Sequence, residues 1–497
     1  MDINFDAAKL KSGTDLRGVA SGVGATLTPP DAVRVGCGFG NWLARRFARA
    51  VVVAVGRDSR LSGEALADGL TRGLCAASVS VIDVGMSTTP AMFEIVNHAD
   101  VKCDAAVMVT ASHLPAERNG FKFILASGGL SGGELDEIIK DINEAGTPPV
   151  PAAACPVKLD FLPYYLRKLE GMVERKLGAD GFSGLRVAVD AGNGGGGFYA
   201  RWLKSLGADI AGSINLEPDG SFPAHPPNPE DGTAIAAISG AVVNAGADIG
   251  VIFDADCDRA ALVSRDGTPL NKERLIALCA AMLTRPDDAE AANGRDDPVW
   301  IVTDSVTSPS FTSFIEELGG RHRRWKRGYK NVITEAKRLN DEGKNCQLAM
   351  ETSGHAAFRD NRFLDDGMYL ATLLLIECVR LKRMNLELES LISGLCLPAV
   401  EAEARIPFEI MEARSAALDK AYAAYKDDGE YVTTLDEPEG LRCERKDGAG
   451  WFILRASLHD PLLVLNVRAK DNETAEAIRQ ACLKAIDIQA VASDDTH

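Results

Sequence analysis

The residues best suited to chemistry in this sequence are three carboxylates at alternate positions, Asp254, Asp256 and Asp258, which directly follow an apolar run. Alternate side chains at the end of an extended strand point the same way, so the three carboxylates can converge on one hard cation. With no pair of histidines or cysteines beside them, Mg²⁺ is favoured over zinc. A calcium EF-hand loop would need Gly and Glu where the sequence has Arg259 and Arg265. A solvated acidic turn is the other alternative.

A second reactive group lies in the string Thr110–Pro115, where Ser112 and His113 follow another apolar run, with Lys122 a short way beyond. A serine at a strand end, with a histidine and a lysine nearby, can act as a nucleophile or carry a phosphoryl group. A Ser-His-acid hydrolase is a different possibility, but no Gly-x-Ser-x-Gly elbow surrounds Ser112. A serine that only caps an ordinary turn fits the string about equally well.

Glu351, Ser353 and His355 form a third polar cluster in one short turn after an apolar run. A carboxylate, a hydroxyl and an imidazole together offer hydrogen-bond donors and acceptors, which suits the hydroxyls of a sugar. The alternative is a helix that begins near Ser353 and uses this serine as its N-cap.

Three basic residues, Arg17, Lys326 and Arg455, lie in turn-like strings. Each can be a solvated surface charge, which is the usual fate of Lys and Arg. The chain carries a net charge of −17, however, so it must gather positive charge locally if it binds a phosphorylated anion. Arg455, Ser457 and a turn of backbone N–H groups would form a phosphate cradle.

The run Gly192–Gly197 supports a competing hypothesis. It matches Gly-x-Gly-x-x-Gly between an expected strand and an expected helix, and Glu217 follows at a suitable distance for a ribose contact. A nicotinamide oxidoreductase is therefore possible. That hypothesis leaves the three aspartates and the two serine clusters without a role.

Alternating strands and helices must position these clusters. Apolar runs bounded by polar turns predict strands buried on both faces, and helical patterns lie between them. The expected strands are Val51–Val55, Ala105–Val109, Val187–Val189, Ile249–Phe253, Trp300–Val302 and Gln347–Met350. The expected helices between them include Glu64–Leu74, Ala234–Ala245 and Pro309–Leu318. This alternation predicts three α/β domains of similar design with mixed or parallel sheets.

Breaks in the pattern divide the chain into four predicted domains. A proline-rich stretch at 146–156 is typical of a linker, and further breaks fall near 267–271 and 395–405. The last segment carries two helical patterns, Ile410–Tyr425 and Asn472–Ile486, around the strands Gly450–Arg455 and Leu462–Arg468. The predicted domains are 1–150, 151–268, 269–398 and a smaller α+β domain at 399–497.

The composition narrows the class of protein. A chain of 497 residues with 46% apolar and 25% charged residues is expected to fold into several domains. No apolar run has the length of a membrane span or a signal peptide, so we expect no membrane association and no secretion. Eleven cysteines without a Cys-x-x-Cys pair indicate a reduced, cytoplasmic protein. An acidic chain is a poor ligand for nucleic acid.

Taken together and in order, these strings resemble the α-D-phosphohexomutase superfamily, the phosphoglucomutase and phosphomannomutase enzymes, over nearly the whole chain. The matching strings are Thr110–Pro115 (phosphoserine loop), Asp254–Arg259 (magnesium loop), Glu351–His355 (sugar-specificity loop), Arg455–Pro461 (phosphate loop), Gly56–Gly63 and Pro218–Pro229. Ala255 and Cys257 stand where the family usually has glycines.

The resemblance implies a fold and an activity. The fold is three related α/β/α domains plus a C-terminal domain like the TATA-binding protein, around a central cleft. The activity is interconversion of hexose 1-phosphate and 6-phosphate, of glucose and/or mannose, through a phosphoserine and a 1,6-bisphosphate. Mg²⁺ is the implied cofactor and glucose 1,6-bisphosphate the activator. Alternatives are a phosphoglucosamine or acetylglucosamine phosphate mutase and a non-catalytic sugar-phosphate binder.

The resemblance also implies a role for each site residue. Ser112 carries the phosphoryl group and shares Mg²⁺ with Asp254, Asp256 and Asp258. His113 and Lys122 assist proton movement, while Arg17 and Arg259 steady the transferring group. Glu351 and Ser353 bind sugar hydroxyls, and the other substrate-binding residues, chiefly for the second phosphate, are Lys326, His355, Arg455, Ser457 and His459. Whether the protein is a monomer or a dimer stays open.

Overall fold

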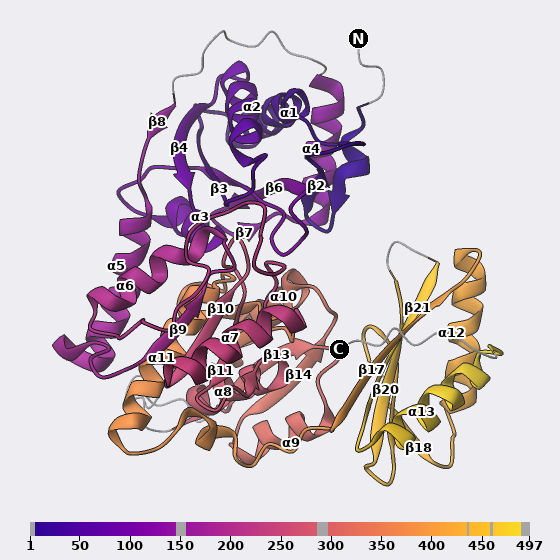
Figure 1. The fold of residues 1–497 in the computed structure, drawn as a ribbon. Helices are drawn as coiled ribbons and strands as arrows, with labels where there is room; N and C mark the ends of the chain where they lie inside the picture. The colour runs from indigo at the N-terminus through magenta and orange to yellow at the C-terminus, as the bar shows by residue number, and fades with distance from the viewer. Residues whose placement is uncertain (1–4, 146–155, 286–296, 435–436, 458–460, 489–497) are drawn as a thin grey trace. The chain divides into compact units, whose positions relative to one another are not determined.

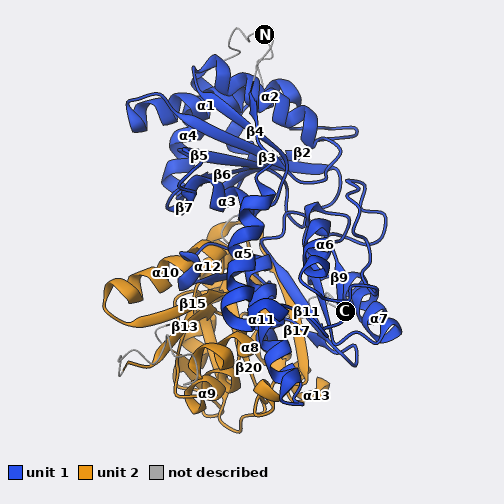
Figure 2. Ribbon diagram, turned by 90° about the vertical axis from the view of Figure 1, so that its left-hand side faces the viewer, with its two compact units in different colours: residues 1–275, 353–389 blue, residues 276–352, 390–497 orange. Residues whose placement is uncertain are grey.

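The computed structural model describes residues 5–145, 156–285, 297–434, 437–457 and 461–488 (Figure 1). The predicted linker at 146–156 therefore lies almost wholly outside the described residues. The chain forms two compact units, coloured separately in Figure 2: residues 1–275 with 353–389, and residues 276–352 with 390–497. Among the described helices, none is both long and apolar enough to cross a membrane.

The first sheet of the first unit carries the serine cluster. Its strand order is β1-β2-β6-β5-β3-β4-β8, and β7 pairs with β6. β3, β4 and β5 are parallel, whereas β2 and β6 run antiparallel to their neighbours, so the sheet is mixed. The strands are β1 (Lys11–Ser12), β2 (Asp15–Val19), β3 (Val52–Arg57), β4 (Ser80–Met86), β5 (Ala105–Val109), β6 (Arg118–Leu125), β7 (Gly128–Gly129) and β8 (Val157–Lys158).

Four helices accompany this sheet: α1 (Pro29–Phe47), α2 (Gly63–Ala76), α3 (Thr89–Asn97) and α4 (Gly132–Ala145). The apolar faces of α1, α2 and α4 pack with the buried strand residues into one core, which includes Phe39, Leu70, Val107, Phe123 and Ile138. Every residue of β5 is buried, as its unbroken apolar run predicts.

The second sheet, also in the first unit, carries the acidic cluster. Its order is β12-β11-β10-β9, with β9 parallel and β11 antiparallel to β10. The strands are β9 (Val187–Asp190), β10 (Ile249–Phe253), β11 (Ala260–Ser264) and β12 (Pro269–Leu270). Other elements of the unit are α5 (Leu162–Leu177), α6 (Phe198–Ser205), α7 (Gly232–Ala245), β16 (Ala356–Phe358) and α11 (Gly367–Arg383).

The second unit contains a parallel arrangement in which β13 (Val299–Asp304) lies between β14 (Arg321–Trp325) and β15 (Asn345–Met350). Its helices are α9 (Pro309–Glu317) and α10 (Tyr329–Asp341). Helix α8 (Lys272–Thr284) leads into this unit, and short 3₁₀ helices occur at Ala7–Leu10, Gly178–Asp180, Gly195–Gly197, Arg359–Asn361 and Leu388–Ile392.

The C-terminal sheet of the second unit is antiparallel throughout, in the order β17-β21-β20-β19-β18. Its elements are β17 (Val400–Pro407), α12 (Met411–Tyr425), β18 (Tyr431–Thr434), β19 (Gly440–Arg445), β20 (Gly450–Ala456), β21 (Leu462–Ala469) and α13 (Asn472–Ala485). Alternate residues of β20 serve two cores: Phe452 and Leu454 pack in the sheet–helix core, whereas Trp451 and Ile453 pack with Val306. The predicted fold class, three α/β/α domains with mixed sheets plus a smaller α+β domain, is confirmed.

Candidate active site

Ser112 lies in the tight turn that follows β5. Its φ is +53°, a left-handed conformation that is strained for a serine, and its backbone N–H donates to Thr110 Oγ1 at 2.8 Å. The side chain is buried, and its Oγ donates to Asp254 Oδ2 at 2.8 Å. No helix begins here, and this hydroxyl contacts the acidic cluster instead of capping a turn, so the capping interpretation is wrong.

Arg60 holds the Ser112 turn in place. The side chain is fully buried, and its guanidinium donates to the backbone oxygens of Ser112, Leu114, Pro115 and Arg118 at 2.5–2.9 Å. Asp58 balances the buried positive charge, since Arg60 Nε donates to its Oδ2 at 3.1 Å. Charge-assisted bonds of this kind are strong and geometrically specific. The string Gly56–Gly63 contains Arg60, but nothing in the sequence indicates a role for this arginine.

The three aspartates converge in a turn after β10, not on an extension of the strand as the sequence analysis expected. Cys257, within the turn, has a φ of +63°, which bends the chain back on itself. Carboxylate oxygens of Asp254, Asp256 and Asp258 all lie within 4.8 Å of one another, and the three side chains are buried. A solvated acidic turn is therefore wrong.

This cluster fits a divalent cation. Asp256 Oδ1 and Asp258 Oδ1 are buried and accept no hydrogen bond within the described residues. Burial and the charges of Asp256 and Asp258 raise the pKa of Asp254 well above its usual value. An ion with oxygen ligands would use the two bare oxygens and relieve the repulsion, so the donor set suits Mg²⁺.

Three cations surround Ser112 and the aspartates. Lys122, on β6, places its Nζ against Asp258 and 3.1 Å from Asp256 Oδ2. Arg17, on β2, donates to Asp15 at 2.8 Å and to the carbonyl of Ala111, next to Ser112, at 3.4 Å.

Arg259 is the third cation and orders two histidines. Its Nη2 donates to His113 Nδ1 at 2.8 Å and its Nε to His355 Nε2 at 3.3 Å, while His355 Nδ1 lies 3.0 Å from Ser353 Oγ. Burial and the charges of Arg259 and Arg17 lower the pKa of His113 to about 3. Both histidines act as acceptors toward Arg259, so His113 is neutral at physiological pH. All the predicted site residues of the first unit therefore lie in one cluster.

The remaining predicted residues lie in the second unit. Glu351 follows β15 and accepts the Gly328 N–H at 2.6 Å; Lys326 is exposed in the turn after β14. No helix begins at Ser353, so the N-cap interpretation is wrong. Ser457 follows β20, and its carbonyl accepts a bond from Arg414 at 2.6 Å. His459 lies outside the described residues.

Arg455 has two charged neighbours that the sequence analysis missed. Its Nη1 lies 3.9 Å from Glu439 Oε1, while Glu439 Oε2 accepts the Arg327 N–H at 3.1 Å. Burial and the nearby charge of Arg327 lower the pKa of Arg455, and the Arg455 Nε is buried without a hydrogen-bond partner among the described residues. An incoming anion would satisfy this donor.

Comparison with known proteins identifies the family. Models of α/β/α domains I, II and III of phosphoglucomutase/phosphomannomutase match residues 9–148, 163–267 and 271–395. The phosphomannomutase/phosphoglucomutase of Pseudomonas aeruginosa is 31% identical over 479 residues, 95% of each chain. The chain belongs to the phosphoglucomutase/phosphomannomutase family. The predicted superfamily is confirmed.

Further relatives agree with this membership. The phosphoglucomutase of Neisseria gonorrhoeae is 30% identical over 469 residues, 94% of each chain. The crystal structure of a phosphoglucomutase/phosphomannomutase family protein from Burkholderia thailandensis matches with a TM-score of 0.80 and 27% identity, covering 98% of this chain and 99% of that one.

In this family member, the glycine run has a packing role. A Cβ on Gly194 would lie 2.7 Å from Ala255, and one on Gly196 would lie 2.8 Å from the Cys257 sulfur. The Gly195 N–H donates to the Ala255 carbonyl at 2.9 Å. The acidic turn packs so closely against this run that larger side chains would not fit at these positions. Packing therefore explains the glycines, and the nicotinamide oxidoreductase hypothesis is not supported.

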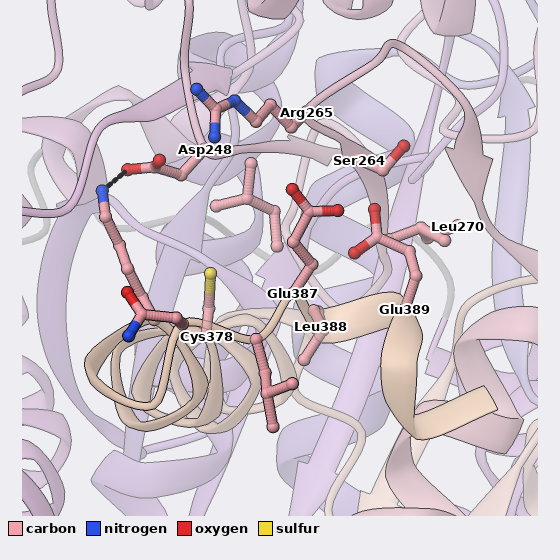
Figure 3. Close-up of a pocket in the computed structure, with 12 residues that line it drawn as sticks. Asp248, Ser264, Arg265, Leu270, Cys378, Glu387, Leu388 and Glu389 are labelled. Atoms are coloured by element: carbon pink, nitrogen blue, oxygen red, sulfur yellow. Dashed lines mark hydrogen bonds and ion pairs between the residues drawn. The ribbon is translucent and has the colours of Figure 1, made fainter. Parts of the chain in front are cut away.

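A cavity of about 310 Å³ in the first unit is separate from this site (Figure 3). Its lining includes Asp248, Ser264, Cys378, Glu387 and Glu389, and it contains no predicted site residue. Ile249, the first residue of β10, also lines it, whereas the aspartates follow the last residue of that strand. The cavity and the acidic cluster therefore lie at opposite ends of β10.

Proposed function

We propose that this family member is an isomerase of the phosphotransferase type that interconverts the 1- and 6-phosphates of glucose and/or mannose through a phosphoserine at Ser112. The observation that carries this proposal is the 2.8 Å hydrogen bond from Ser112 Oγ to Asp254 Oδ2. It joins a nucleophile-type residue after one strand to a metal-type cluster after another, 142 residues further along the chain.

Phosphoryl transfer depends mainly on positioning and on neutralising charge at the transferring group. Mg²⁺ held by Asp254, Asp256, Asp258 and Ser112 would supply much of that neutralisation when bound. Arg17 and Arg259 flank the serine and would balance the remaining negative charge on the phosphoryl oxygens.

Proton movement at the sugar hydroxyl is assigned to Lys122 and His113. The Lys122 ammonium is buried, contacts two aspartates of the cluster and carries protons that it can donate. His113 is neutral and can accept a proton, but its low pKa makes it a weak base. Lys122 is therefore the better general acid and base of the two.

Arg455, Ser457, Lys326 and His459 are proposed to bind the phosphate that is not reacting, and Glu351, Ser353 and His355 the sugar hydroxyls. The intermediate would be a hexose 1,6-bisphosphate that rebinds with its ends exchanged, and glucose 1,6-bisphosphate would serve as activator. A phosphate site that accepts either end of the sugar makes such an exchange possible.

Less direct assignments complete the proposal. We place the domain boundaries at 1–150, 151–268, 269–398 and 399–497, and the protein in the cytoplasm, consistent with the lack of disulfides among its described cysteines. A phosphoglucosamine or acetylglucosamine phosphate mutase, and a non-catalytic binder, stay as alternatives.

A coupled assay tests the function. Glucose, mannose and glucosamine 1-phosphates are supplied separately with glucose 1,6-bisphosphate and Mg²⁺. We expect turnover of the glucose or mannose substrate. Turnover of the amino sugar alone would favour the first alternative, and tight binding without any turnover would favour the second.

A further inference from the structure

His225 lies in a segment that the active-site description does not use, between α6 and α7. Its ring is almost fully buried, with 1% of the side chain exposed. Nδ1 lies 2.8 Å from the carbonyl oxygen of Pro226, and Nε2 lies 2.9 Å from Asp190 Oδ2. A carbonyl and a carboxylate only accept hydrogen bonds, so these two contacts favour a proton on each ring nitrogen; Asn215 Nδ2 also lies 3.3 Å from Nε2 but is closer to Asp190 Oδ1, at 3.1 Å. The geometry describes a buried imidazolium.

The second oxygen of Asp190 is hydrogen-bonded as well. Its Oδ1 accepts hydrogen bonds from the Gly192 N–H at 2.9 Å and from Asn215 Nδ2 at 3.1 Å. Asp231 also faces the imidazole, and its carboxylate caps α7 by accepting N–H bonds from the first turn of that helix. Burial opposes the charge of His225, but the bonds to Asp190 and Pro226 and the two carboxylates raise its pKa above the usual value.

The segment around His225, residues 218–231, touches two arginines of the site. The guanidinium carbon of Arg60 lies 5.1 Å from the centroid of the Phe222 ring. The backbone at Gly220 approaches Ser59 so closely that a Cβ would lie 2.3 Å from its carbonyl oxygen. Glu230 Oε2 lies 3.8 Å from Arg259 Nη1. The segment contains no helix or strand, so its course depends on side-chain contacts and on isolated backbone bonds, such as that from the Asp219 N–H to the Asn193 carbonyl at 2.8 Å.

We propose that His225, held as an imidazolium between Asp190 and the Pro226 carbonyl, is a positioning residue that keeps segment 218–231 against Arg60 and Arg259. It acts on the reaction only through those arginines, which hold the Ser112 turn and flank the phosphoryl group. Its effect on turnover rests on the proposed function, whereas its protonation and its hold on the segment do not.

The direction of the pH effect follows from the raised pKa. The contribution of the imidazolium is fully present below the ordinary histidine pKa and is lost as the pH rises through the raised value. Deprotonation leaves Asp190 or the Pro226 carbonyl without its donor. The segment then loosens, and kcat/KM falls on the alkaline side.

The first test measures protonation without any assay of turnover. The protein is labelled with ¹⁵N-histidine, and the ring nitrogens of its seven histidines are observed by NMR, with His225→Gln assigning the resonance. We expect both nitrogens of His225 to be protonated at pH 7 and to titrate above 6.5. A neutral single tautomer at pH 7 would overturn the proposal, whatever the enzyme's activity.

The second test measures the positioning role. Hydrogen exchange of residues 218–231 and the pH profile of kcat/KM are compared for wild type, His225→Gln, Asp190→Asn and His98→Gln. His98 is the control, because its ring contacts are with Phe161 and Tyr164. We expect residues 218–231 of His225→Gln to exchange faster, and its kcat/KM to lose the fall at alkaline pH. In Asp190→Asn this fall should occur about one pH unit lower. His98→Gln should behave like wild type. Wild-type hydrogen exchange and an unaltered pH profile of kcat/KM in His225→Gln would contradict the positioning role.

Discussion

At the scale of single residues, the backbone of Ser112 shows where the fold accepts strain for chemistry. A serine with φ of +53° is unfavourable by an amount of order 1–3 kcal/mol and persists only when its surroundings hold it. Here the Arg60 guanidinium, which binds four carbonyls of this turn, supplies that hold. The strained turn directs the hydroxyl toward Asp254.

We predict that Ser112→Ala abolishes mutase turnover and leaves the fold intact, because only a hydroxyl is lost from the turn. Coupled assay and circular dichroism measure the two effects. Ser80→Ala, at an exposed position on β4, is the matched control and should keep wild-type turnover. Wild-type turnover by Ser112→Ala would remove the serine from the mechanism.

Arg455→Ala should raise KM for the hexose phosphate about 10- to 100-fold with a smaller change in kcat, since a charged hydrogen bond is worth roughly 1.5–3 kcal/mol. Steady-state kinetics on both sugar phosphates provides the measurement. Arg479→Ala, which removes an ion pair with Glu476 on α13, serves as the control. A lower kcat at unchanged KM would mean that Arg455 does not bind the phosphate that is not reacting.

At the scale of elements, the sequence predicted the buried strands well because continuous apolar runs are a local signal. β5, β10 and β15 begin and end within two residues of their predicted positions. The antiparallel strands β2 and β6 were not predicted, although they carry Arg17 and Lys122. β6 pairs with β5, the strand before it, but β2 pairs with β6, which lies far along the chain, and no local pattern reveals that contact. The Arg60 contacts to Ser112, 52 residues away, were missed for the same reason.

The buried pair of Asp58 and Arg60 yields a prediction about this packing. Arg60→Met should destabilise the protein by about 3–5 kcal/mol, because it leaves the Asp58 carboxylate buried without its counter-charge, and should lower kcat by displacing the Ser112 turn. Denaturant unfolding and the coupled assay measure both effects.

The double variant Asp58→Asn/Arg60→Met is the informative comparison. It removes both charges, so part of the lost stability should return, whereas kcat should stay low because the turn still lacks its arginine. Equal stability of Arg60→Met and wild type would show that the pair does not support the turn.

At the scale of the whole molecule, sequence order carried more information than composition. Six strings in the order of one family predicted the three α/β/α domains and the C-terminal α+β domain. Neither the net charge of −17 nor the string Trp325–Arg327 indicated that Arg327 and Glu439 lie beside Arg455. Charged neighbours of this kind depend on how β19 and β20 pack on the rest of their unit.

Metal binding should stabilise the folded protein as a whole, since the unfolded chain does not assemble three carboxylates. Mg²⁺ at a hundred times its Kd should add about 2.7 kcal/mol and raise Tm accordingly, and EDTA should reverse the shift and stop turnover. Asp256→Asn should lose most of the Mg²⁺-dependent shift in Tm. Asp419→Asn, at an exposed position on α12, should keep it; a full shift in Asp256→Asn would place the ion elsewhere.

The chemical state of Ser112 tests the central claim most directly. The protein is incubated with glucose 1,6-bisphosphate and Mg²⁺, quenched and digested, and the phosphorylated peptide is located by mass spectrometry. We predict one phosphoryl group on Ser112. When that group carries ³²P and free bisphosphate has been removed, unlabelled glucose 1-phosphate should take the label into the hexose phosphates. Phosphate on a different residue, or none at all in protein that turns over substrate, would contradict the account.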